Sequence, residues 1–91
     1  MSNAIFEDAI KICQDLIRIP SVNYGDGKGD ERVVADYIVN SLAEVGIQAK
    51  IYESAPNRCN VIANLEGADS ARPGLVLHGH IDVVPAAADE W

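Results

Sequence analysis

Two histidines and an aspartate stand close together near the end of the chain, at His78, His80 and Asp82. They directly follow the apolar run from Leu75 to Leu77, which has the composition of a buried strand. Because side chains alternate faces along a strand, His80 and Asp82 are expected to project to the same side. A neutral imidazole is a common metal ligand, and its second nitrogen needs a partner that sets the tautomer. Asp82 is either that partner or a further ligand.

The place of these residues at the end of a strand also bears on function. In open α/β sheets, ligands bind at the edge where strands reach their carboxyl ends. Pro85 fits a strand that ends here, because proline has no N–H to give to a neighbouring strand. An ordinary polar transition from a strand to a loop would carry the same residue types, so spacing alone leaves both interpretations open.

The segment Leu77-His-Gly-His-Ile-Asp-Val-Val-Pro85, followed by Asp89-Glu-Trp91, resembles the first metal-binding motif of the M20 family of zinc peptidases. That family includes dipeptidases, carboxypeptidases, aminoacylases, acetylornithine deacetylase and succinyl-diaminopimelate desuccinylase. The resemblance implies that His80 is a ligand of one zinc ion and that Asp82 is the catalytic-site acid that holds this histidine. His78 does not match the ligand position, and we expect it to be structural or to line the pocket.

The resemblance further implies a function, the hydrolysis of an amide or peptide bond in a small peptide or an N-acyl amino acid. Members of the family hold two zinc ions per active site, with cobalt or manganese as substitutes. The metal polarises the carbonyl and activates water, and a glutamate moves the proton. The chain contains neither the family's Gly-Arg-Gly-x-x-Asp segment nor its Glu-Glu pair. We therefore expect residues 1–91 to be an N-terminal fragment of the catalytic domain, without the rest of that domain or the lid or dimerisation domain, and inactive alone.

Composition limits the possible partners and the compartment. Acidic residues outnumber basic ones 14 to 7, and the net charge of −7 disfavours nucleic acids and anionic membranes as partners. No apolar run approaches the roughly 20 residues that cross a bilayer. The first residues lack the pattern of a signal peptide. Cys13 and Cys59 are expected to be free thiols, as in a cytoplasmic protein.

The first half of the chain predicts two helices. Residues 4–18 repeat apolar side chains at helical spacing before Pro20, and we expect that stripe to pack in a core. A second helix is expected over 31–45, capped by Asp30 and ended by Gly46. Residues 21–30 are expected to form a loop. Their Gly-x-Gly-x-Gly run is not a phosphate site, because no strand precedes it.

The second half predicts three strands. Residues 47–53 and 60–66 are joined by a turn and should pair antiparallel, and the run from Leu75 is the third strand. Arg58 and Asn60 either fix the turn or meet a substrate carboxylate. The order α-α-β-β-β places the chain in the α/β class. With the resemblance, we expect the N-terminal part of a three-layer αβα zinc-peptidase domain, with a mixed sheet, both helices on one face and the third strand central.

Two other functions remain open at this stage. The chain could be a non-catalytic binding or assembly module, or one half of a split enzyme. It could also bind metal adventitiously through His78 and His80. Because an uncovered apolar sheet face is costly in water, we expect the fragment to self-associate into a homo-oligomer.

Overall fold

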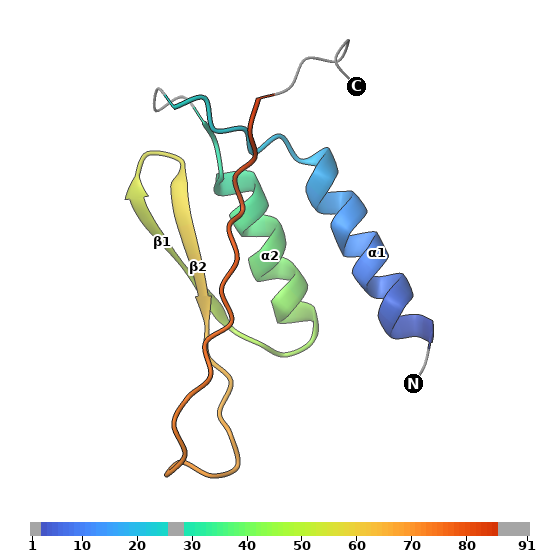
Figure 1. Cartoon of the computed structure of the whole chain (residues 1–91), viewed down its shortest axis with the longest axis vertical. Helices are drawn as coiled ribbons and strands as arrows, with labels where there is room; N and C mark the ends of the chain where they lie inside the picture. The colour runs from blue at the N-terminus through green and yellow to red at the C-terminus, as the bar shows by residue number, and fades with distance from the viewer. Residues whose placement is uncertain (1–2, 26–28, 86–91) are drawn as a thin grey trace.

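The computed structural model describes residues 3–25 and 29–85 in the order α1, α2, β1, β2 (Figure 1). Helix α1 spans Asn3–Arg18, α2 spans Arg32–Glu44, β1 spans Ala49–Ala55 and β2 spans Arg58–Ala63. Within the described ranges the sheet consists of two antiparallel strands. The α/β class is therefore as expected, whereas the three-layer mixed sheet is not formed here. The Asp89-Glu-Trp91 part of the motif lies outside the described residues.

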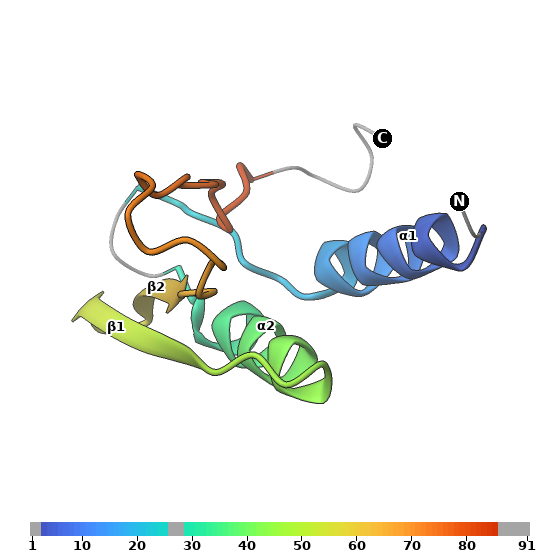
Figure 2. The ribbon, with the colours of Figure 1, turned by 90° about the horizontal axis from the view of Figure 1, so that it is seen from below.

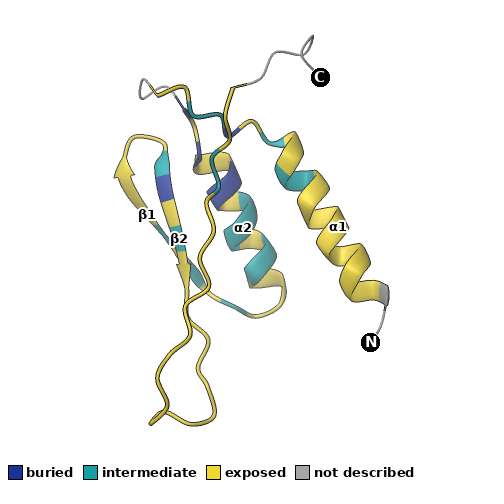
Figure 3. Ribbon diagram, viewed as in Figure 1, coloured by how far each residue is buried: buried dark blue, intermediate teal, exposed yellow. Residues whose placement is uncertain are grey.

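Helix α1 forms where the apolar spacing predicts it, but its apolar stripe does not reach a core. Phe6, Ile10 and Ile17 are all exposed, and Figures 2 and 3 show the helix standing apart from the hairpin. A polar contact links it to α2: the Tyr37 hydroxyl donates to Asp15 Oδ2 at 2.7 Å. The expectation of core packing is therefore wrong for this chain, because the hairpin buries one face of α2 and offers no surface to α1.

Helix α2 packs against the hairpin and carries most of the small core. The N-cap residue is Glu31 and not Asp30, but the Arg32 N–H donates to Asp30 Oδ1 at 2.9 Å, so Asp30 supports the start of the helix from one residue further out. The helix ends at Glu44, and Gly46 follows with a φ of 82°, the left-handed conformation that glycine adopts most easily. Val34 and Ala35 are buried on the face that meets the strands.

The hairpin is of the expected type, with strand limits shifted by about two residues. The turn occupies Pro56 and Asn57, and Asn57 takes a left-handed φ of 61°. The Asn57 N–H donates to Glu53 Oε1 at 2.9 Å, so the side chain of one strand closes the turn. Pairing therefore continues to Ala55 on one side and starts at Arg58 on the other.

Glu31 fastens the start of α2 to this hairpin. Its side chain is buried, and its Oε1 accepts the Cys59 N–H at 3.1 Å, while Oε2 lies 3.6 Å from the Arg58 guanidinium. Its own N–H donates to the Asn57 carbonyl at 2.8 Å. Arg58 thus lies at the join between helix and hairpin, and a contact of Arg58 or Asn60 with a substrate carboxylate stays a prediction.

The expected third strand is not formed. Leu75, Val76 and Leu77 are 86%, 84% and 88% exposed, and residues 73–82 have no regular structure. The segment runs beside the hairpin (Figures 1 and 2), but a cavity of about 960 Å³, lined by Arg58–Asn64 and by Leu75–Asp82, separates it from β2. A strand needs a neighbour about 4.8 Å away to complete its hydrogen bonds. Because β2 lies beyond the cavity, the apolar run has no such neighbour.

Two further observations concern the cysteines and the membrane. Cys13 is an exposed free thiol and Cys59 a buried one, as the composition led us to expect. Burial raises the pKa of the Cys59 thiol. Neither helix in the described part of the chain has the length and apolar character needed to cross a bilayer.

Candidate metal site

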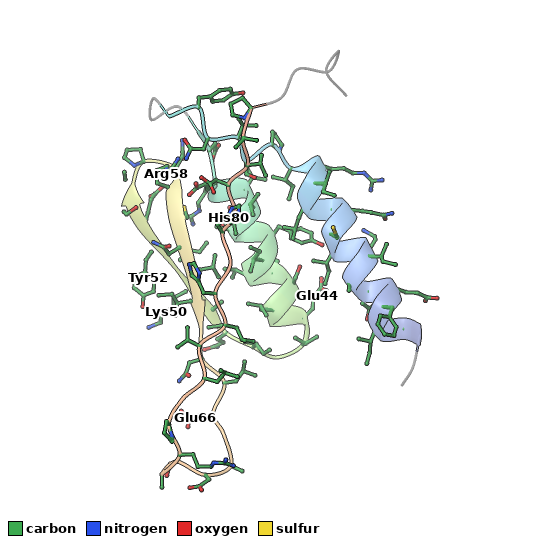
Figure 4. All side chains as sticks on the ribbon, in the orientation of Figure 1. Glu44, Lys50, Tyr52, Arg58, Glu66 and His80 are labelled. Atoms are coloured by element: carbon green, nitrogen blue, oxygen red, sulfur yellow. The ribbon has the colours of Figure 1, made fainter. Side chains whose placement is uncertain are left out.

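The segment that carries the motif is anchored at its polar end. Val83 forms an isolated parallel bridge with Val22, in which the Val83 N–H donates to the Ser21 carbonyl at 3.0 Å. The Asn23 N–H in turn donates to the Val83 carbonyl at 2.8 Å. These bonds tie the motif to the residues that follow α1. Figure 4 shows His80 on this segment.

His80 and Asp82 are in direct contact. His80 Nδ1 lies 3.1 Å from Asp82 Oδ1 and 2.9 Å from the Asp82 main-chain carbonyl. A carbonyl and a carboxylate only accept hydrogen bonds, so Nδ1 must carry the proton. In the neutral form of the ring the lone pair is then on Nε2, the form in which an imidazole binds a metal. The ring itself is 82% exposed, so packing contributes little to its orientation.

Asp82 is held from its other side by Asn23. The Asn23 amide donates from Nδ2 to Asp82 Oδ2 at 2.8 Å. This hydrogen bond lowers the pKa of Asp82 below its usual value, and partial burial opposes that shift without cancelling it. Both carboxylate oxygens thus have a donor, and Asp82 is placed to support the histidine.

The sequence reasoning did not identify Asn23. It stands 59 residues before Asp82, at the start of what we expected to be a loop. The signal was local: Asn23 directly follows the Ile19-Pro-Ser-Val22 stretch, which comes after the end of α1. No spacing rule connects such distant residues, so this contact required the structure.

His78 is exposed and lines the larger cavity beside β2, together with His80 and Asp82. A smaller cavity of about 400 Å³ is lined by Asn23, His80, Asp82, Val83 and Val84. Within residues 3–25 and 29–85, no group of three or more His, Cys, Asp or Glu side chains could hold a metal ion. His80 with its support from Asp82 therefore fits a zinc ligand, but these residues supply only part of a complete zinc site.

These features define an α/β piece in which Asp82 supports the imidazole of His80. Sequence comparison adds similarity to amide-bond hydrolases. The chain is 33% identical over 85 residues to acetylornithine deacetylase of Vibrio cholerae and 30% identical over 86 residues to a probable succinyl-diaminopimelate desuccinylase of Staphylococcus epidermidis. It is 32% identical over 99 residues to an uncharacterized carboxypeptidase of Schizosaccharomyces pombe. The first two are M20-type enzymes, which agrees with the motif.

These matches cover 90%, 93% and 99% of this chain but only 21%, 19% and 17% of the three relatives. The chain thus spans about a fifth of their length. No known protein-family profile matches it, and no solved structure matches it.

Proposed function

We propose that this chain is the N-terminal part of the catalytic domain of an M20-type, zinc-dependent hydrolase. The enzyme cleaves an amide or peptide bond in a small peptide or an N-acyl amino acid. The observation that supports this most is the supported histidine: Asp82 holds Nδ1 of His80 and leaves Nε2 free at a cavity, within the segment that resembles the family's motif. The similarity to a deacetylase, a desuccinylase and a carboxypeptidase supports the reaction class.

In this proposal His80 and Asp82 each have one role. His80 binds one zinc ion through Nε2, and Asp82 orients the ring and keeps the proton on Nδ1. Zinc supplies a Lewis acid for the amide carbonyl and for water, and cobalt or manganese can replace it. The remaining ligands, the second zinc ion and the general base come from other residues of the enzyme. The 91-residue chain alone is then inactive. The two free cysteines fit a cytoplasmic enzyme.

The test is hydrolysis by the product of the complete reading frame that contains these residues. The protein is purified without metal, loaded with zinc and assayed on a panel of N-acyl amino acids and dipeptides. We expect hydrolysis of one substrate class that chelators remove and zinc restores. His80→Ala should lower kcat/KM by at least about 100-fold, because a lost ligand weakens zinc binding. His78→Ala is the matched control and should change it only a few-fold.

Two results would overturn the proposal. One is a zinc-loaded protein that hydrolyses no member of the panel. The other is hydrolysis that His80→Ala leaves at the wild-type rate, since His80 would then hold no metal in the reaction.

One observation favours the alternative that the chain is one half of a split enzyme. A cavity of about 960 Å³ is lined by β2 and by Leu75–Asp82, and the apolar side chains of Leu75–Leu77 are almost fully exposed. A separately encoded remainder of the hydrolase could insert a strand there. Mixing the chain with the corresponding C-terminal part of a relative, and finding zinc-dependent hydrolysis that neither part shows alone, would support this alternative. No activity in the mixture would count against it.

A further inference from the structure

Asn23 connects the start of the chain to the metal motif through its side chain. We propose that Asn23 is a positioning residue of the metal site, which holds the Asp82 carboxylate and, through it, the His80 imidazole. The inference rests on the proposed function, because His80 is a metal ligand only there. It adds a residue outside the motif to the machinery of the site.

The orientation of the Asn23 amide is determined on both sides. Its Oδ1 accepts the Gly25 N–H at 2.9 Å, which turns the NH₂ group towards Asp82. The Nδ2 atom then donates to Asp82 Oδ2 at 2.8 Å. The main chain of Asn23 is fixed as well, because its N–H donates to the Val83 carbonyl. A side chain held at both its oxygen and its nitrogen can transmit a fixed geometry to its partner.

Asp82 passes this geometry on to the ring. Its Oδ1 lies 3.1 Å from His80 Nδ1, while Oδ2 is occupied by Asn23. The His80 side chain is 82% exposed, whereas that of Asp82 is 29% exposed. The ring therefore depends on Asp82 for its orientation, and Asp82 depends on Asn23. Partners of this kind, one step removed from the metal, commonly change metal affinity about 10- to 100-fold.

An asparagine suits this position for a chemical reason. Its amide donates a hydrogen bond without adding charge, so Asp82 keeps the negative charge that attracts the proton on His80 Nδ1. A lysine or arginine would neutralise that charge, and an aspartate would offer only acceptors and repel Asp82. Asn23 also lines the smaller cavity with His80, so a disturbance here reaches the space next to the ring.

The test measures the tautomer of His80 in the 91-residue chain. With ¹⁵N-labelled histidine at a pH where the rings are neutral, the Nδ1 and Nε2 chemical shifts report which nitrogen holds the proton. We expect His80 to be mainly protonated on Nδ1. In Asn23→Leu, which removes the donor, we expect a shift towards the Nε2-protonated form that free histidine favours. His78 serves as the internal control and should not change.

A second variant separates the hydrogen bond to Asp82 from the turn at Gly25. Asn23→Asp keeps an acceptor for the Gly25 N–H and loses the donor to Asp82, so it should shift the His80 tautomer as Asn23→Leu does. Slow exchange of the Val83 amide, which donates to the Ser21 carbonyl, would show that the local fold persists in both variants. Only Asn23→Leu is used for zinc titrations, because a new carboxylate could itself bind the ion.

Zinc affinity, measured on the metal-free product of the complete reading frame, gives the second readout and distinguishes the two proposals. We expect Asn23→Leu to weaken zinc binding by about 10-fold and His80→Ala to weaken it further. If His80→Ala leaves zinc binding unchanged, the proposed function fails. If His80→Ala abolishes it while Asn23→Leu changes neither the tautomer nor the affinity, the role of Asn23 is overturned and the proposed function stands.

Discussion

The two ends of the segment Leu75–Pro85 are held very differently. Its apolar end, Leu75–Leu77, is almost fully exposed and pairs with no strand in the described part of the chain. Its polar end is bridged to Val22 through Val83, and Asp82 receives a hydrogen bond from Asn23. The part with the composition of a strand therefore lacks a partner, while the part with the chemistry is anchored by main-chain and side-chain hydrogen bonds.

The difference shows what each kind of contact requires. An apolar strand is stable only beside a second strand and under a covering layer, and both are long-range conditions. A hydrogen-bonded site needs only a few donors and acceptors at the right places, which Ser21, Asn23 and Val83 provide. The geometry around His80 thus does not require a strand beside Leu75–Leu77.

The largest effect we predict concerns the apolar end. The wild-type chain should self-associate, because Leu75–Leu77 exposes apolar surface that water disfavours. Burying a Leu side chain is worth about 1.5–3 kcal/mol. Replacing Leu75 and Leu77 together by Ser should therefore weaken association by more than about tenfold, as measured by light scattering across a concentration series.

The control for this change lies at the other end of the same segment. Val84 is 79% exposed but next to the anchored residues, and Val84→Ser should leave association within a few-fold of the wild type. An equal loss in both variants, or a wild-type chain that is monomeric at all concentrations, would contradict the comparison.

The sequence predicts the elements that nearby residues determine, and it does not predict an element that needs a partner far away in the chain. Both helices follow from nearby residues: the apolar spacing, the Asp30 carboxylate before α2 and Gly46 after it. The hairpin is predicted in kind, but its limits depend on the left-handed Asn57 and on the Glu53 side chain that closes the turn. The third strand could not be judged from composition, because its partner is not part of its own sequence.

In the candidate metal site, too, the contact between nearby residues is predicted and the contact between distant residues is not. The spacing of His80 and Asp82 predicts that they share a side, and in the structure they touch, although the segment is irregular and not a strand. Whether they bind a metal stays a prediction. Asn23 could not be found from spacing, because a contact across 59 residues is made by the fold.

A smaller effect is expected where the polar end is anchored. A Cβ atom on Gly29 would lie 2.6 Å from the Val22 carbonyl oxygen, so Gly29→Ala must displace the main chain that pairs with Val83. Such overpacking costs about 1–3 kcal/mol. We expect faster exchange of the Val83 amide and a lower free energy of unfolding. Gly67→Ala, with nothing within 4 Å, is the control and should leave the Val83 amide unchanged. Slow Val83 exchange in Gly29→Ala would show that the bridge does not depend on this close approach.

A comparable or smaller effect is expected where α2 meets the hairpin. Glu31→Ala leaves the Cys59 N–H without its buried acceptor, which costs about 1–3 kcal/mol. In a Cys13→Ser background, the Cys59 thiol should then react faster with a disulfide reagent, because it is buried in the wild type. Glu31→Gln keeps an acceptor oxygen and should react close to the wild-type rate. If Gln and Ala accelerate the reaction equally, the charge near Arg58 matters more than the hydrogen bond.

The smallest effect concerns the polar contact between α1 and α2. Like the segment Leu75–Leu77, α1 has exposed apolar side chains, so its polar contacts can be compared with those of the motif segment. Hydrogen bonds from Lys11, at 2.7 Å, and from Tyr37 lower the pKa of Asp15. A lowered pKa means that the folded chain favours the charged form, so this contribution to stability is present above the unfolded pKa, near 3.8. It is lost as the pH falls through the lower pKa of the folded chain.

Thermal unfolding of the wild type and Asp15→Asn from about pH 7 down to about pH 2 tests this contribution. The amide oxygen introduced by this substitution would still accept from the Tyr37 hydroxyl but would carry no charge for Lys11, so the variant should be slightly less stable near neutral pH. The difference should shrink below about pH 4 and vanish once Asp15 is protonated in the folded wild type. A difference that persists at the acid end of the series would show that the Asp15 charge does not hold α1. Polar contacts would then hold the polar end of the segment Leu75–Pro85 in place but not helix α1, although both have exposed apolar side chains.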